Sequence, residues 1–315
     1  MRTSRLFTAH SAIVVAAIGW LSLIPLSGKG FSDWSSPENV GAAVNSVFNE
    51  QHPALSRDGS SLYFVSDRPG GLGGFDLYVS QRRDGESEWG TPVAVEALNS
   101  PASEFAPAFD PDGHMIFFGS ERPGGCGGRD LWMSFRRNKR DDFGWEPPVN
   151  LGCIVNSPGF DDGPTLFEDE TRGLTTLYFI SNRPGGRGDR DIWTTTRSSD
   201  GSFSLPVNVT ELNSAASDSR PAIARNGLEI FFTSQRTGSV PLNGVASTDF
   251  WSSFRRSAMD PWSTPVNVAA LNSNATDAAP ALSRDRATLF FNSDRPGGFG
   301  ALDLYVSLRT RTKGN

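Results

Sequence analysis

The segment PALSRDGSSLYFVSDRPGGLGGFDLYVS, residues 53–80, contains three short runs of strand-forming residues separated by turn residues. Tyr, Phe and Val recur in the runs, whereas Gly, Pro, Asp and Ser fill the gaps, as expected for β-strands joined by tight turns. Similar segments begin at four further prolines, with successive spacings of 54, 57, 57 and 59 residues. A period of this length indicates a repeat protein. The five prolines are Pro53, Pro107, Pro164, Pro221 and Pro280.

The first four repeats each have a fourth strand-forming element, in which an aromatic residue precedes a proline by three positions, as in Trp89 and Pro92. One such element, beginning at Trp34, stands before the first repeat, and the fifth repeat ends without one. Four strands per repeat are typical of a propeller blade. We therefore predict an all-β fold, a five-bladed β-propeller of four-stranded antiparallel blades in a single domain, residues 31–312. Residues 34–40 would supply the outer strand of the last blade and close the ring.

The composition agrees with a globular chain rich in turns. Among 315 residues there are 33 Gly and 21 Pro, and the formal net charge is −6. A mildly acidic chain without a basic arm does not indicate nucleic-acid binding. No stretch after residue 30 has the 3.6-residue apolar period of an amphipathic helix, which argues against an α/β fold.

The N-terminal segment resembles a secretory signal. Arg2 and Arg5 precede an uncharged run from Ser11 to Leu26, and small residues follow at Ser27 and Gly28. The run has about 16 residues, fewer than the roughly 20 that span a bilayer comfortably. We expect residues 1–28 to be a signal peptide and the protein to be periplasmic or secreted. The alternative is an uncleaved N-terminal anchor in the inner membrane.

The repeats are similar to PD40 repeats, a WD40-like family found in the propeller of TolB and in other bacterial envelope proteins. The resemblance is carried by units such as the one quoted above and by four loops of the type DRPGG, and it covers roughly residues 34–309. It implies a β-propeller that acts in the bacterial envelope. The TolB propeller has six blades, so the predicted five-bladed ring departs from that relative.

An acidic residue begins the innermost strand of every repeat, three positions before the repeat's proline. These acids would form a ring around the axis, as a cation site or as the mouth of a sugar-binding funnel. Alternatively, each carboxylate accepts backbone N–H groups or pairs with the arginine of its own repeat, Arg68, Arg122, Arg183, Arg236 or Arg295. Because the acid recurs in every repeat, we favour this structural role. The acids are Glu50, Glu104, Asp161, Asp218 and Asp277.

The positions between acid and proline do not repeat, so they are better candidates for ligand binding. His52, Phe105, Asp162 and Arg220 stand there, an aromatic group together with charges of both signs. In a propeller these segments and the glycine loops lie on one face. We predict that the four residues line an asymmetric pocket at the axis; the alternative is ordinary decoration of the rim.

The two cysteines are expected to form a disulfide. Cys126 lies in the second glycine loop and Cys153 follows the fourth strand of the same repeat, so both lie on the same predicted face. An oxidising compartment permits the bond. Two insertions, residues 168–173 and 238–248, interrupt the repeat without a predicted role.

Known catalytic patterns are not recognisable. The sequence has no Gly-x-Ser-x-Gly motif, no His and Cys spacing that suits catalytic zinc, and no Walker loop. We predict a monomeric, non-catalytic propeller that binds a protein or glycan of the envelope through its axial face, without a cofactor. The alternatives are bound calcium and a glycoside hydrolase that uses carboxylates of the funnel.

Overall fold

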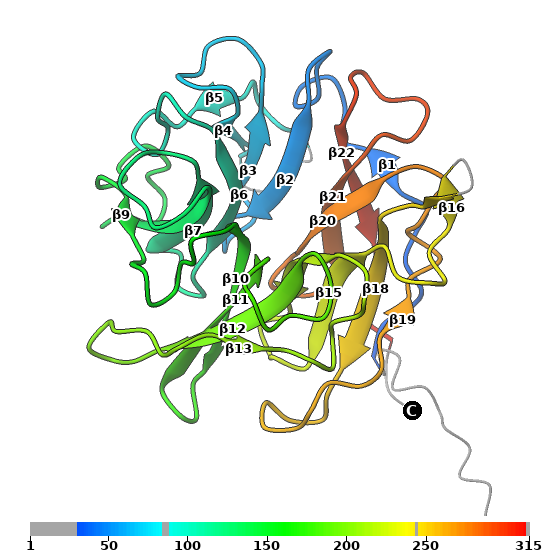
Figure 1. The fold of residues 1–315 in the computed structure, drawn as a ribbon. Coiled ribbons are helices and arrows are strands. Elements are labelled where there is room, and N and C mark those ends of the chain that lie inside the picture. The colour runs from blue at the N-terminus through cyan, green and yellow to red at the C-terminus, as the bar shows by residue number, and fades with distance from the viewer. Residues whose placement is uncertain (1–29, 84–87, 243–244, 313–315) are drawn as a thin grey trace, which may run out of the picture.

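The computed structural model describes residues 30–83, 88–242 and 245–312. In this part of the chain the regular structure consists of β-strands, which form five four-stranded antiparallel sheets around a common axis (Figure 1). The predicted five-bladed propeller is therefore confirmed. No helix within these residues is long and apolar enough to cross a membrane. The predicted signal peptide, residues 1–28, lies outside them.

The first strand of each blade lies at the axis. It pairs with the second strand on one side only, and its other edge is not paired in any sheet. Neighbouring first strands contact one another around the ring. The inner strands are β2 (Glu50–Leu55), β6 (Glu104–Phe109), β10 (Asp161–Asp169), β14 (Asp218–Ile223) and β20 (Asp277–Leu282).

The second and third strands carry most of each sheet, and the outer strands are only two residues long. The second strands are β3 (Ser61–Ser66), β7 (Met115–Ser120), β11 (Leu174–Ser181), β15 (Glu229–Ser234) and β21 (Thr288–Ser293). The third strands are β4 (Asp76–Gln81), β8 (Asp130–Phe135), β12 (Asp191–Arg197), β18 (Asp249–Phe254) and β22 (Asp303–Leu308). The outer strands are β5 (Val93–Ala94), β9 (Val149–Asn150), β13 (Val207–Asn208), β19 (Val266–Asn267) and β1 (Glu38–Asn39).

The N-terminal strand closes the ring, as predicted. In Figure 1, β1 (blue) lies beside β22 (dark red), where Glu38 pairs with Val306 and Asn39 with Tyr305. The last blade therefore combines both ends of the propeller sequence. This pairing removes the sheet edge that β22 would otherwise expose at the seam.

The hydrophobic core is divided among the junctions between blades. Successive residues of a strand point to opposite faces of its sheet, and both faces of each blade are covered by neighbours. In β3, Tyr63 and Val65 pack toward the second blade, whereas Leu62 and Phe64 pack toward the last one. This two-sided burial explains why the second strands read as nearly continuous apolar runs.

Both insertions form hairpins. The first lengthens β10 and β11, which have nine and eight residues where the equivalent strands of other blades have six. The second contains a small two-stranded sheet of β16 (Pro241–Leu242) and β17 (Val245–Ala246) in the connection between β15 and β18.

Candidate functional site

Each repeated acid is fully buried at the start of its inner strand. Asp161 shows the arrangement: its carboxylate accepts hydrogen bonds from the backbone amide and the hydroxyl of Ser157, at 2.6 and 2.8 Å. Arg183 donates to the second oxygen at 2.6 Å. The backbone N–H of Asp161 donates to the carbonyl of Arg129 in the preceding blade. Through its carboxylate and its backbone, Asp161 therefore connects the linker at Ser157, the loop at Arg183 and the preceding blade at Arg129.

The same contacts recur around the ring. Arg68, Arg122, Arg236 and Arg295 pair with Glu50, Glu104, Asp218 and Asp277 in the same way. This is the geometry of the structural role that the sequence favoured. None of the five acids has exposed surface. The ring is therefore a set of buried ion pairs that hold the blades together, rather than an open cluster of carboxylates available to a metal or a ligand. Within the described residues, no group of three or more metal-ligating side chains occurs.

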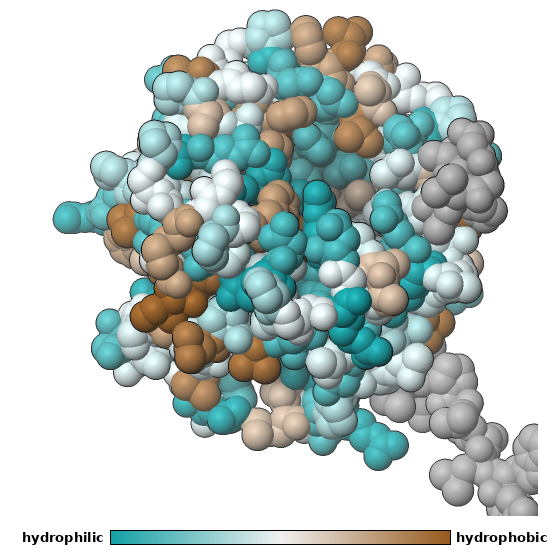
Figure 2. Space-filling model, in the orientation of Figure 1, coloured by the Kyte–Doolittle hydropathy of each residue, from teal (hydrophilic) through white to brown (hydrophobic). Residues whose placement is uncertain are grey.

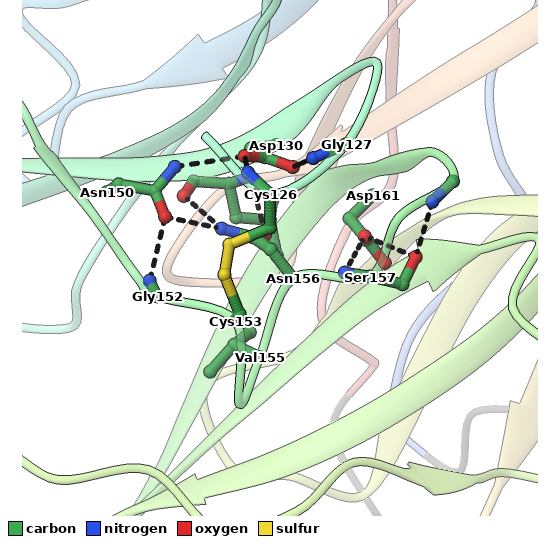
Figure 3. Close-up of a disulfide and its surroundings, with 12 residues drawn as sticks. Cys126, Gly127, Asp130, Asn150, Gly152, Cys153, Val155, Asn156, Ser157 and Asp161 are labelled. Carbon is green, nitrogen blue, oxygen red and sulfur yellow. Dashed lines mark hydrogen bonds between the residues drawn. A yellow bond between two sulfur atoms is a disulfide. The ribbon is translucent and has the colours of Figure 1, made fainter. Parts of the chain in front are cut away.

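A second buried carboxylate, at the start of the third strand, holds each glycine loop in place, as Figure 3 shows for the second blade. Asp130 accepts hydrogen bonds from the backbone amides of Cys126 and Gly127 and from the side chain of Asn150. A Cβ on Gly125 would lie 1.8 Å from a carboxylate oxygen of Asp130. The loop must therefore carry glycine at this position for the carboxylate to enter.

Cys126 and Cys153 form a disulfide that ties this glycine loop to the segment after β9 (Figure 3). The two residues are 27 positions apart in the sequence. Equivalent segments of the other blades have no such bond, because the chain has only two cysteines. The disulfide thus adds a covalent link to one blade of an otherwise repeated scaffold.

Just inside the ring of acids, the backbone of every inner strand turns into the left-handed region. The residue before each proline has φ between 47° and 60°, and the pairing to the second strand shifts register there. Together with the prolines these residues line a narrow chamber of ≈ 40 Å³ on the axis. The five residues are His52, Ala106, Gly163, Arg220 and Ala279.

The four non-repeating residues that the sequence singled out lie together beside this chamber. The fully buried carboxylate of Asp162 pairs with Arg220 at 2.8 Å. The ring centroids of His52 and Phe105 are 6.1 Å apart, and the two rings meet edge to face. His52 and Arg220 come from blades on either side of the axis, so the cluster gathers four different inner strands.

Arg129 completes the cluster and was not among the predicted residues. It pairs with Asp162 at 2.9 Å and with Glu121 at 2.7 Å, and its guanidinium lies 3.4 Å from the ring centroid of Phe105. The position before the third strand of a blade holds Phe75, Arg129, Arg190, Thr248 and Leu302. Because the residue type at this position changes from blade to blade, the sequence already marked it as a candidate for ligand binding rather than for the scaffold.

Electrostatics keep Asp162 charged and His52 neutral. Burial alone would raise the pKa of Asp162, but the guanidiniums of Arg220 and Arg129 outweigh it and lower the pKa to about 2. Burial, reinforced by Arg220, lowers the pKa of His52 well below its usual value. The Nδ1 atom of His52 is buried without a hydrogen-bond partner among the described residues.

A larger cavity continues along the axis, on the side of the prolines away from the ring of acids. It has a volume of ≈ 180 Å³ and shares all five prolines with the narrow chamber. Its wall comes from the second halves of the inner strands and from the turns that follow them. The wall is mixed: prolines, alanines and larger apolar residues such as Leu55 and Ile223 share it with polar and charged residues.

Charged residues surround this larger cavity. Arg225 pairs with Glu170 at 3.0 Å, and Arg57 and Arg284 also line it. Burial, followed by the negative charges of Asp112 and Glu170, raises the pKa of Glu168. Glu168 and Glu170 belong to the first insertion, which thereby contributes to the cavity. The sequence did not place this insertion at the axis. Figure 2 shows mostly hydrophilic residues around the middle of one face of the ring.

Comparison with solved structures gives several propellers at low sequence identity. A GH62 α-L-arabinofuranosidase catalytic domain from Coprinopsis cinerea is 13% identical, covers 91% of this chain and 99% of its own, with a TM-score of 0.57. An α-L-arabinofuranosidase of Podospora anserina in complex with cellotriose is 12% identical, with 89% and 96% coverage and a TM-score of 0.54. At such identities the likeness shows the β-propeller fold alone.

TolB of Acinetobacter baumannii is 14% identical over 85% of this chain and 55% of its own, with a TM-score of 0.47. No family model matches the chain, and no curated protein matches it in sequence. The resemblance to PD40 repeats therefore continues to rest on the sequence motifs quoted above.

Proposed function

We propose that this chain is a non-catalytic binding propeller of the bacterial envelope, which engages a protein or glycan at its axis. The observation that carries the proposal is the axial cavity of ≈ 180 Å³, whose wall combines apolar residues with polar and charged ones. Ligand sites commonly combine an apolar wall with a few polar groups. The cavity lies where the five inner strands converge, so all blades contribute to one site.

The engagement of the repeated acids argues against catalysis by them. Glycoside hydrolysis needs two carboxyl groups at the scissile bond, one of which donates a proton. The ring acids are fully buried and held by arginines. Asp162 lies close to the axis, but a pKa of about 2 leaves its carboxylate without a proton at neutral pH. A carboxylate in this state is unsuited to the role of general acid.

A glycoside hydrolase is the second candidate, and one observation favours it. Glu168 lines the larger cavity with a raised pKa, and Glu170 lines the same cavity. A carboxyl group with a raised pKa near a second carboxylate is the pair that general acid catalysis requires. The arabinofuranosidase structures share the fold and lend this alternative an architectural precedent.

A cavity-filling variant distinguishes binding at the axis from binding elsewhere. Thr165 lines the larger cavity and is half-buried, so Thr165→Trp should fill the space. Thr194→Trp, on the outer part of the same blade, is the matched control. The full-length protein would be tested on a glycan array and in pull-downs from envelope extracts. We expect ligands to be lost with T165W and kept with T194W.

Two results would contradict the proposal. Equal retention of every ligand by T165W and wild type would place binding away from the axis. Release of sugar from arabinan or another polysaccharide, abolished by Glu168→Gln in a folded protein, would establish the hydrolase instead.

The envelope location is part of the proposal. It is supported by the signal-like residues 1–28 and by the disulfide between Cys126 and Cys153, since structural disulfides persist mainly in oxidising compartments. Fractionation of cells that express the full chain tests it. Recovery of the protein from the cytoplasm with reduced cysteines would contradict an envelope location.

A further inference from the structure

The guanidinium of Arg220 has unused donors beside the narrow chamber. Arginine carries five N–H donors, and among the described residues the partner of this guanidinium is one oxygen of Asp162. The Arg220 side chain is 13% exposed and lines the chamber, together with His52. Arg129, by contrast, uses its donors on both Asp162 and Glu121. Arg220 is therefore the cation of the cluster with capacity for another acceptor.

His52 gives a second, independent indication of a ligand. His52 is only 8% exposed and lines the same chamber. Its Nδ1 atom has no hydrogen-bond partner within the described residues. A buried polar atom normally has a hydrogen-bond partner, and leaving one unpaired costs about 1–3 kcal/mol. The chamber therefore presents two groups, an imidazole nitrogen and a guanidinium, that an incoming polar group would satisfy.

The charge balance indicates which polar group this is. Arg129 and Arg220 face the single buried carboxylate of Asp162, and the second carboxylate, Glu121, is 42% exposed. Burial, followed by the positive charges of Arg129 and then Arg190, lowers the pKa of Arg220. An anion is therefore favoured over a cation or a neutral group. A planar carboxylate matches the fork of a guanidinium best.

The space and the backbone around the axis indicate what carries the carboxylate. The chamber of ≈ 40 Å³ has room for little more than the carboxylate itself, and the adjoining cavity of ≈ 180 Å³, with its prolines and aliphatic residues, receives what is attached. This volume is below the roughly 300–1,000 Å³ of pockets that enclose a whole small molecule. The inner strands leave one edge unpaired along the cavity, and such an edge offers hydrogen bonds to an extended chain.

Together these features favour the end of a polypeptide. Leu55 lies three positions after His52 along β2, which corresponds to about 10 Å of extended chain. We propose that the axis binds the C-terminal end of a partner polypeptide. The terminal carboxylate would pair with Arg220, and an apolar last side chain would occupy the proline-walled cavity. This inference rests on the proposed binding function and assigns the ligand class of the same site.

The experiment compares N-acetylated tetrapeptides that end in Leu, Phe or Ser, each as the free acid and as the C-terminal amide. Binding to the full-length protein is measured by calorimetry at low salt. A charge-assisted hydrogen bond to a buried group predicts that amidation weakens binding by about 10- to 150-fold. The peptides ending in Leu or Phe should also bind more tightly than those ending in Ser.

Variants assign this effect to the chamber. Arg220→Gln should abolish the difference between acid and amide, while Arg137→Gln, at an exposed position on a turn of the second blade, should preserve it. Thermal unfolding of both variants checks that they are folded. If R220Q does not fold, the comparison of acid and amide on wild type and on His52→Asn still decides.

Equal affinities for acid and amide, or a difference that survives in folded R220Q, would overturn the inference. Binding of glucuronate without any peptide acid would also overturn it and assign the anion site to an acidic sugar. If no peptide binds while T165W still abolishes a ligand found on the array, this inference fails and the proposed function stands. If T165W affects no ligand at all, both fail.

Discussion

Replacing Asp161 by Ala should destabilise the propeller strongly without altering the axial cavity. The buried carboxylate holds Ser157 and Arg183, and the Arg183 side chain is only 12% exposed. The variant would leave this guanidinium without the carboxylate that neutralises it. Removing one partner of a buried ion pair costs about 3–5 kcal/mol, because the other charge remains desolvated.

The expected loss is large enough to measure by urea unfolding. A domain of this kind has a total stability of about 5–15 kcal/mol, so the variant should fold but with a reduced margin. With a urea m-value of about 3 kcal/mol/M, the midpoint should fall by about 1.0–1.7 M. Tryptophan fluorescence reports the transition, because Trp193 and Trp132 are buried between blades.

Asp189→Ala is the matched control, since it lies in the glycine loop of the same blade and its side chain is 79% exposed. We expect its stability to stay within about 0.5 kcal/mol of wild type. The reasoning is refuted if D161A unfolds at the same urea concentration as wild type. It is also refuted if folded D161A loses an axial ligand that D189A keeps, because Asp161 would then be a binding residue.

Three further predictions concern an ion pair between the last two blades, the disulfide and pH. Glu229 forms a buried bidentate ion pair with Arg309 between the last two blades, so Glu229→Gln should cost about 3–5 kcal/mol in urea unfolding; a loss below about 1 kcal/mol would contradict this. Replacing Cys126 and Cys153 by Ser should cost about 3.5 kcal/mol for their 27-residue separation, checked in the same assay against the wild type with its disulfide intact. The pKa of His52 is lowered in the folded state. The contribution of His52 to the free energy of unfolding is therefore present above about pH 6.5, the pKa of an unfolded histidine, and is lost as the pH falls below that value. The free energy of unfolding should change with a slope of at most about 1.4 kcal/mol per pH unit. His52→Asn should remove this slope, and a variant with an unchanged slope would show that His52 titrates normally.

The repeated parts of the molecule could be predicted because their physics is local. Runs such as residues 62–66 and 116–120 alternate between two buried faces, and fixed turn residues follow them. The spare element at Trp34 predicted the closing strand, since an open sheet edge at the seam would be unfavourable. Even the arginine partner of each ring acid followed from its recurrence in every repeat, as Arg68 shows for Glu50.

The candidate site could be predicted only in part, because its shape depends on how far side chains reach between blades. Asp162 occupies a predicted position, but its carboxylate extends to Gly119 of the preceding blade, where a Cβ would lie 2.3 Å from Oδ1. Arg129 reaches Asp162 from a loop 33 residues earlier. The register shift beside each proline, as at Pro53, is also not indicated by residue types alone.

The backbone conformation beside the prolines is common to all five inner strands, whereas the side chains at this position differ between blades. His52 and Arg220 both have φ near 50°, a conformation that costs a residue with a side chain roughly 1–2 kcal/mol. Gly163 occupies the equivalent position of the third blade with φ of 60°, so the fold accepts glycine there without this cost. Ala106 and Ala279 have the same left-handed φ, at 47° and 54°, with only a methyl group as side chain. The strained conformation is therefore a property of the repeat and does not depend on the side chain. What distinguishes the first and fourth blades is the chemistry of the side chain at this position, an imidazole and a guanidinium that line the chamber.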